Sequence, residues 1–93
     1  NYEFIYHSII YRAKYRTIDS YTERHHILPK CLGGSNDKVN IVRLTPEEHY
    51  LAHQLLVRMH PTNPKLVYAA MLMTQSGDGT RVNNGCMGGY END

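Results

Sequence analysis

Cysteine is scarce in this chain of 93 residues, and the spacing of the two that are present fits no known framework. Cys31 and Cys86 are too few for a fold held by several disulfides. They also form no Cys-x-x-Cys pair of the kind that binds zinc. We therefore expect two free thiols in a reducing compartment, as is typical of a cytoplasmic protein.

Long apolar stretches are also missing. No run approaches the ~20 residues that a membrane span requires, and no charged segment followed by an apolar one indicates a secretory leader. No internal repeat is visible. A hydrophobic fraction of 41% nevertheless argues against wholesale disorder. The expectation is one small domain without a membrane partner, in a size range where the core is thin and a bound metal adds stability.

Charge is close to balanced overall but is unevenly distributed. The net charge is +1; residues 1–75 hold nine Lys/Arg against six Asp/Glu, whereas residues 76–93 hold one against three. A mildly basic body is compatible with a polyanionic partner. Glycine, asparagine and aspartate dominate residues 76–93, which we expect to be a flexible tail or the stub of a truncated element, outside a single domain at 1–75.

Hydrophobic periodicity predicts the first half of the domain. Apolar residues recur at helical spacing over residues 2–15. Residues 24–28 are partly β-branched and end at Pro29, which favours a short strand. Residues 33–37 have the composition of a loop, and residues 39–44 alternate as a second strand.

The clearest boundary begins at Thr45. Thr45-Pro46-Glu47-Glu48 combines an N-cap hydroxyl, a proline suited to the first helical position and a glutamate that can close a capping box. This helix should reach Met59 and stop before Pro61, and Asn63-Pro64 should begin another. The predicted fold class is therefore α+β.

Histidines occupy positions that geometry can bring together. A helix beginning at Thr45 places His49 and His53 one turn apart on one face, where they can share a cation. Two solvated histidines are the alternative if this pair is taken alone. Neighbours on a strand point to opposite faces, so His25 and His26 cannot be two equivalent ligands. One can face the cation while the other approaches a substrate.

The segment from Glu23 to His53 resembles the HNH nucleases. The features that carry this resemblance are, in order, His-His-Ile-Leu-Pro at 25–29, the glycine pair 33–34, Asn40 before Val42, Leu-Thr-Pro-Glu-Glu-His at 44–49 and the following His53. The resemblance implies a ββα-metal core at 23–59, with an additional helix before it and another after it. It points to the small free-standing HNH endonucleases of phages and introns, which places the chain inside a bacterial host.

The resemblance also implies roles for five residues. His26 would be the general base that deprotonates water, and Asn40 would lie in the loop-strand region and make hydrogen bonds by which His26 keeps its orientation and tautomer. His25, His49 and His53 would hold one divalent metal ion. Imidazole ligands favour Zn²⁺, Ni²⁺, Mn²⁺ or Co²⁺, and Mg²⁺ is also compatible. Hydrolysis of DNA would leave 5′-phosphate and 3′-hydroxyl ends, and RNA is not excluded as a substrate.

Charged residues around this core have weaker assignments. Arg24, Lys30 and Arg43 are candidates for contact with phosphate, although a residue of this kind taken alone is more often a solvated surface charge. Glu23 is expected either to fix a basic residue near the phosphate or to lie solvated on the surface. A zinc-stabilised nucleic-acid-binding module without catalysis is the alternative function. Structural zinc sites normally use four protein ligands, which counts against it.

Overall fold

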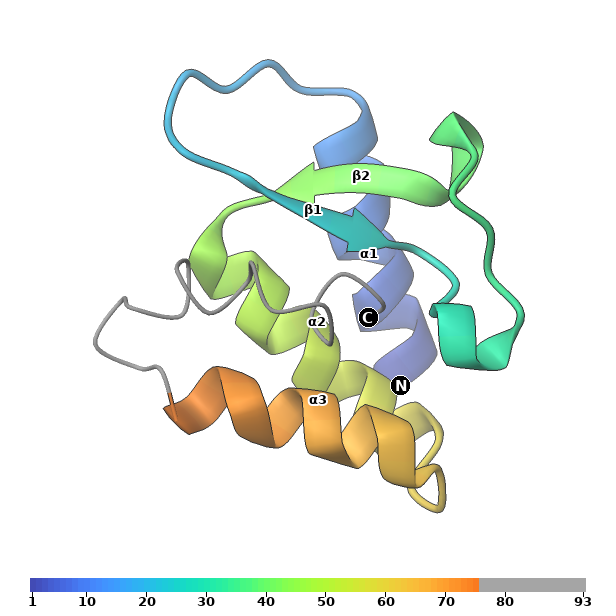
Figure 1. Ribbon diagram of the computed structural model, residues 1–93. Coiled ribbons are helices and arrows are strands. Elements are labelled where there is room, and N and C mark those ends of the chain that lie inside the picture. The colour runs from blue at the N-terminus through green and yellow to red at the C-terminus, as the bar shows by residue number, and fades with distance from the viewer. Residues whose placement is uncertain (76–93) are drawn as a thin grey trace.

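The computed structural model describes residues 1–75 and shows an α+β arrangement in that part of the chain (Figure 1). The elements are helix α1 (Tyr2–Lys14), strand β1 (Glu23–His26), the short 3-10 helices η1 (Lys30–Leu32) and η2 (Lys38–Asn40), strand β2 (Ile41–Leu44), and helices α2 (Pro46–Met59) and α3 (Pro64–Gln75). The predicted ββα core, preceded by one helix and followed by another, is confirmed. The prediction for residues 76–93, and that for Cys86, fall outside the described residues.

The two strands form an antiparallel sheet whose register separates two faces. His25 is opposite Val42 and His26 is opposite Ile41. Because residues that face each other across a sheet share a side, His25 lies on the face of buried Val42, whereas His26 lies on the other face. The sheet therefore separates the two neighbouring histidines as alternation predicted.

The second strand begins two residues later than its alternation predicted. Val39 and Asn40 belong to η2 instead, and the Asn40 N–H donates to the Asp37 carbonyl at 2.8 Å. This turn bond takes the backbone donor that a longer strand would have used, so the ladder starts only at Ile41. The two 3-10 turns were not expected from the sequence.

Helix α1 supplies one wall of the core. Its N-cap is Asn1, whose side chain accepts from the Phe4 N–H at 3.0 Å. Tyr6, Ile9 and Ile10 form its buried face and pack toward α2 and β2. Among the described residues, the buried core cluster consists of Tyr6, Ile9, Ile10, Val42, Leu44, Ala52, Leu55, Leu56 and Leu66.

Helix α2 begins with the predicted capping box. The Thr45 hydroxyl accepts from the Glu48 N–H at 3.2 Å, and the Glu48 carboxylate accepts from the Thr45 N–H at 2.9 Å. Pro46 is the first helical residue, where its missing N–H costs nothing. The helix ends at Met59, before Pro61, as expected.

The turn after α2 leads into α3, which packs against it. The Asn63 side chain accepts from the N–H groups of Lys65 and Leu66 at 3.0 and 3.2 Å, confirming the predicted cap. Within residues 1–75, no helix is both long enough and apolar enough to pass through a lipid bilayer.

Candidate metal and catalytic site

Three histidines meet between the sheet and helix α2. His25 comes from β1, and His49 and His53 come from one face of α2. Their candidate ligand nitrogens all lie within 4.8 Å of one another. The ring centroids are 5.1 Å apart for His25–His49, 5.4 Å for His25–His53 and 4.9 Å for His49–His53. The structure thus brings together the three predicted metal ligands.

The exposed fractions of the rings distinguish a buried site from histidines on a solvated helix surface. His49 is 7% exposed and His53 is 1% exposed, so the alternative of two solvated helix histidines does not hold. Burying charge is costly, which favours neutral imidazoles with lone pairs to offer. Three such nitrogens fit a borderline divalent ion, and within residues 1–75 this group of three leaves a coordination position for water or substrate. The donor set therefore suits a catalytic rather than a closed structural metal site.

Glu23 lies behind this cluster, against His49. Its Oε1 is 2.7 Å from His49 Nδ1, and the Tyr21 hydroxyl donates to its Oε2 at 3.2 Å. A carboxylate accepts from His49 Nδ1–H, so Nε2 is the nitrogen left for a metal ion, and the outer bond fixes the ring. Glu23 is therefore not a solvated surface residue, because its side chain is 10% exposed and bonds to an imidazole. That it also fixes a basic residue near the phosphate stays a prediction.

His26 lies on the opposite face of the sheet and is held by a different side chain. It is 1% exposed, and its Nε2 is 2.8 Å from Asn36 Oδ1. Asn36 stands in the glycine-rich loop, where the sequence indicated only a turn. Nothing in the spacing pattern pointed to it; the tendency of asparagine to make local side-chain bonds is the only available hint.

The Asn40 side chain clamps the loop backbone on both sides of the glycine pair. Its Oδ1 accepts from Leu28 N–H at 2.8 Å, and its Nδ2 donates to the carbonyls of Leu28 at 3.0 Å and Ser35 at 2.8 Å. Within residues 1–75 these side-chain hydrogen bonds go to backbone groups and tie Ser35, the neighbour of Asn36, to Leu28. An influence of Asn40 on the orientation of His26 would pass through this loop, and it stays a prediction.

Gly34 lets this clamp close. A Cβ at that position would lie 1.7 Å from the Leu28 carbonyl oxygen and 2.9 Å from Asn40 Nδ2. Its N–H also donates to the Pro29 carbonyl at 3.0 Å. Glycine is needed here because the loop backbone approaches the end of β1 too closely for any side chain.

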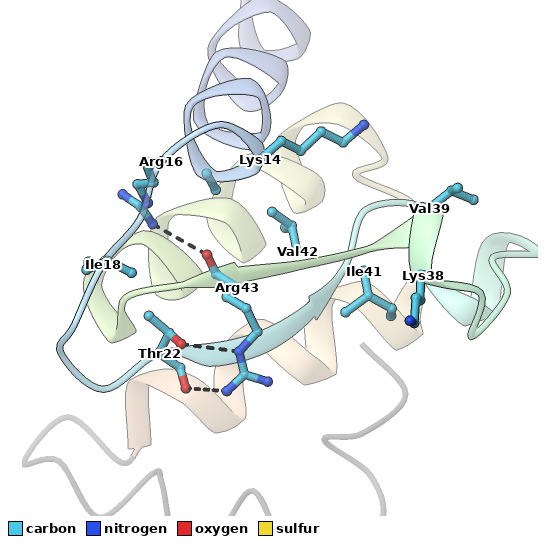
Figure 2. A pocket seen from close by; sticks show the side chains of 10 residues that line it. Lys14, Arg16, Ile18, Thr22, Lys38, Val39, Ile41, Val42 and Arg43 are labelled. Carbon is cyan, nitrogen blue, oxygen red and sulfur yellow. Dashed lines mark hydrogen bonds between the residues drawn. The ribbon is translucent and has the colours of Figure 1, made fainter.

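The basic residues named from the sequence are exposed. Arg24 and Arg43 are opposite each other in the register, on the same face as His26, and Lys30 begins η1. Arg43 donates through Nε to the Thr22 hydroxyl at 3.2 Å and through Nη2 to the Thr22 carbonyl at 2.9 Å (Figure 2). Their contact with phosphate remains a prediction.

A pocket of about 470 Å³ lies beside β2, away from the three histidines. Figure 2 shows its wall, which is formed by the end of α1, the following loop, η2 and β2. Its basic lining residues are Lys14, Arg16, Lys38 and Arg43. Four basic residues that are separated in the sequence therefore line this one pocket beside β2.

Arg16 forms an ion pair with Glu48, which lies in the first turn of α2, one residue before His49. Its Nη1 and Nη2 donate to the two carboxylate oxygens of Glu48 at 2.7 and 2.5 Å. The hydrogen bond from Arg16 lowers the pKa of Glu48 to about 2 from its ordinary value of 4.5, against an opposing effect of burial. This pair was not predicted, since the two residues are 32 positions apart.

Sequence comparison gives relatives but no solved structure. No protein-family model matches the chain, and no solved structure matches it. It is 48% identical over 89 residues, 90% of its length, to a protein named "Probable mobile endonuclease B" of Enterobacteria phage T4. It is 44% identical over 82 residues, 87% of its length, to "Probable mobile endonuclease E" of the same phage. The chain spans 33% of the first relative and 57% of the second.

A shorter match comes from a different kind of organism. Over 33 residues, 36% of the chain, it is 52% identical to an "Uncharacterized 38.5 kDa protein in psbA intron 1" of Chlamydomonas moewusii. That match covers 10% of the algal protein.

Proposed function

We propose that residues 1–75 form a metal-dependent HNH endonuclease domain that hydrolyses DNA to 5′-phosphate and 3′-hydroxyl ends. The observation that carries this proposal is the group of three buried histidines with ligand nitrogens within 4.8 Å of one another, beside a fourth histidine on the next strand position. Similarity to proteins named as probable mobile endonucleases of a phage supports the same reading, including a phage-encoded origin.

His25, His49 and His53 would hold one divalent ion. A bound ion would supply Lewis-acid stabilisation of the negative charge that develops at the phosphate during hydrolysis. Nitrogen ligands favour Zn²⁺, Ni²⁺, Mn²⁺ or Co²⁺, with Mg²⁺ the less suited choice. Glu23 keeps the His49 ring in the orientation this requires.

His26 is proposed as the general base, with a defined reacting atom. The amide oxygen of Asn36 can only accept, so the His26 Nε2 carries the hydrogen of that 2.8 Å bond. Nδ1 is then the nitrogen that takes a proton from water as the water oxygen bonds to phosphorus. The bond from phosphorus to the 3′ oxygen breaks, that oxygen takes a proton from solvent to become the 3′-hydroxyl, and His26 then returns its proton to solvent. Asn40 contributes indirectly, by holding the loop that carries Asn36.

Positive charge near His26 would position the phosphate backbone. Arg24 and Arg43 share the sheet face of His26, and Thr22 orients the Arg43 guanidinium in advance. Lys30 is the first residue of η1, four positions after the end of β1. The N-terminus of α2 adds the positive end of a helix dipole on the His49 side.

Supercoiled plasmid incubated with the purified chain and Mn²⁺, Ni²⁺, Zn²⁺ or Mg²⁺ tests the proposal. Nicked or linear product that disappears with a chelator and with His26→Ala supports it. Intact plasmid with every ion, together with retained DNA binding and retained metal in both proteins, would instead indicate a zinc-stabilised binding module. Cleavage of RNA alone would change the substrate class and keep the chemistry.

A further inference from the structure

Helix α1 lies outside the ββα core, yet one of its side chains reaches the candidate metal site. Tyr6 is 1% exposed, and its hydroxyl oxygen is 2.8 Å from His25 Nε2 and 2.7 Å from the carbonyl oxygen of Ile27. From sequence, Tyr6 was only one member of an apolar helical stripe.

The number of available hydrogens fixes which group donates in each of the two hydrogen bonds of the Tyr6 hydroxyl. A tyrosine hydroxyl has one hydrogen and a carbonyl oxygen can only accept, so the hydrogen of Tyr6 points to Ile27. The oxygen of Tyr6 is therefore the acceptor toward His25, and the hydrogen in that bond belongs to His25 Nε2. A neutral imidazole has one N–H, which leaves Nδ1 of His25 as its lone-pair nitrogen.

The acceptor that orients Tyr6 is itself held in place. The Ile27 N–H donates to the Asn40 carbonyl at 2.8 Å, which continues the pairing of β1 and β2 by one residue. The next peptide, which carries the Ile27 carbonyl, is held as well, because its Leu28 N–H donates to Asn40 Oδ1 at 2.8 Å. Tyr6 sits among the buried residues of α1, so neither the ring nor its hydroxyl can turn away freely.

We propose that Tyr6 is a positioning residue of the metal site, which holds His25 as the Nε2–H tautomer so that Nδ1 is its metal-binding atom. The inference rests on the proposed metal site and goes beyond it, because it makes the helix preceding the ββα core part of the metal centre. Residues outside the ligand shell that orient a histidine in this way change metal affinity without touching the ion.

The isosteric variant Tyr6→Phe tests this, with Tyr11→Phe as the matched control. Tyr11 lies on the same helix but is 68% exposed. Binding of Zn²⁺ alone, measured by competition with a chromogenic chelator, should weaken by about 10- to 100-fold in Tyr6→Phe and stay unchanged in Tyr11→Phe. A thermal melt of each metal-free protein monitors folding.

A spectroscopic measurement on the metal-free wild type keeps the proposal open to contradiction should Tyr6→Phe fail to fold. Long-range ¹H–¹⁵N correlation spectra distinguish the two histidine tautomers, and the signals of His25 are assigned by their loss in His25→Gln. The expected result is the Nε2–H tautomer. An Nδ1–H tautomer in the wild type, or wild-type Zn²⁺ affinity in folded Tyr6→Phe, would overturn the assignment.

Neither readout uses DNA. If plasmid stays intact while both results come out as expected, the proposed nuclease activity fails and the role of Tyr6 stands. If cleavage depends on His26 but Tyr6→Phe binds Zn²⁺ normally, the role of Tyr6 fails and the proposed function stands.

Discussion

Glu23 Oε1 lies 2.7 Å from His49 Nδ1, so a carboxylate–imidazole hydrogen bond joins strand β1 to helix α2 directly behind the proposed metal site. Both side chains are 10% exposed, which limits competition from water. The bond crosses between the two elements that supply the three proposed ligands. Rigid placement of His49 relative to His25 follows from this link.

Replacing Glu23 with glutamine should weaken metal binding while leaving the fold intact. The amide keeps the shape of the carboxylate but loses its charge, so His49 becomes a poorer and less well oriented ligand. Zn²⁺ affinity measured by calorimetry should fall by about 10- to 100-fold. Glu47→Gln is the matched control, since Glu47 is exposed in the first turn of α2. Equal affinity in the two variants would remove Glu23 from the site.

Asn36→Ala should slow cleavage without loss of metal. Its amide oxygen is the acceptor that sets the tautomer of His26, and a general base contributes roughly 10²- to 10⁴-fold to rate. Partial loss of that contribution predicts a fall in kcat of about tenfold or more, with unchanged Zn²⁺ affinity. Ser35→Ala serves as the control in the same loop. An unchanged kcat in Asn36→Ala would show that the tautomer is set by another group.

Gly34→Ala should destabilise the loop far more than Gly33→Ala. At Gly34 the new methyl group would collide with the Leu28 carbonyl, whereas at Gly33 nothing lies within 4 Å and the cost comes only from its φ of 98°. Overpacking of this kind costs about 1–3 kcal/mol or more. Denaturant unfolding of both variants measures the difference. A Gly34→Ala protein as stable as wild type would mean that the clamp around Asn40 is not as tight as described.

Acid should remove the stabilisation supplied by Arg16 and Glu48 over a defined range. The pKa of Glu48 is lowered from 4.5 to about 2 in the folded protein, so its contribution is fully present above pH 4.5 and is lost as pH falls toward 2. The free energy of unfolding of Glu48→Gln should therefore vary less with pH than that of wild type between these values. Parallel curves for the two proteins would contradict the assigned shift.

Sequence reasoning succeeded where local chemistry decides the outcome. The capping box at Thr45 set the start of α2 and therefore placed His49 and His53 on one face. Strand alternation separated His25 from His26 because the period of a strand is two residues, whatever the sheet packs against. These two local rules, with the family resemblance, were sufficient to name the three histidines that converge.

What could not be predicted depends on contacts between distant segments. Tyr6 and His25 are 19 positions apart, and Arg16 and Glu48 are 32 apart. The spacing of apolar residues does not predict such pairs, because they form only when α1 and the loop after it pack against the core. The contact of Asn36 with His26 was missed for a related reason. It depends on the loop that the Asn40 side chain holds from the 3-10 turn η2, and no local rule places that loop beside the sheet.

The central claim is that the site divides its histidines between metal binding and proton transfer. Parallel measurement of Zn²⁺ affinity and plasmid cleavage in His26→Ala and His53→Ala tests it most directly, with His60→Ala as the control. The account predicts that His26→Ala binds Zn²⁺ like wild type but cleaves about 10²- to 10⁴-fold more slowly. His53→Ala should lose both properties, and His60→Ala neither. Wild-type cleavage by His26→Ala, or loss of its Zn²⁺ binding to the extent seen in His53→Ala, would contradict the claim.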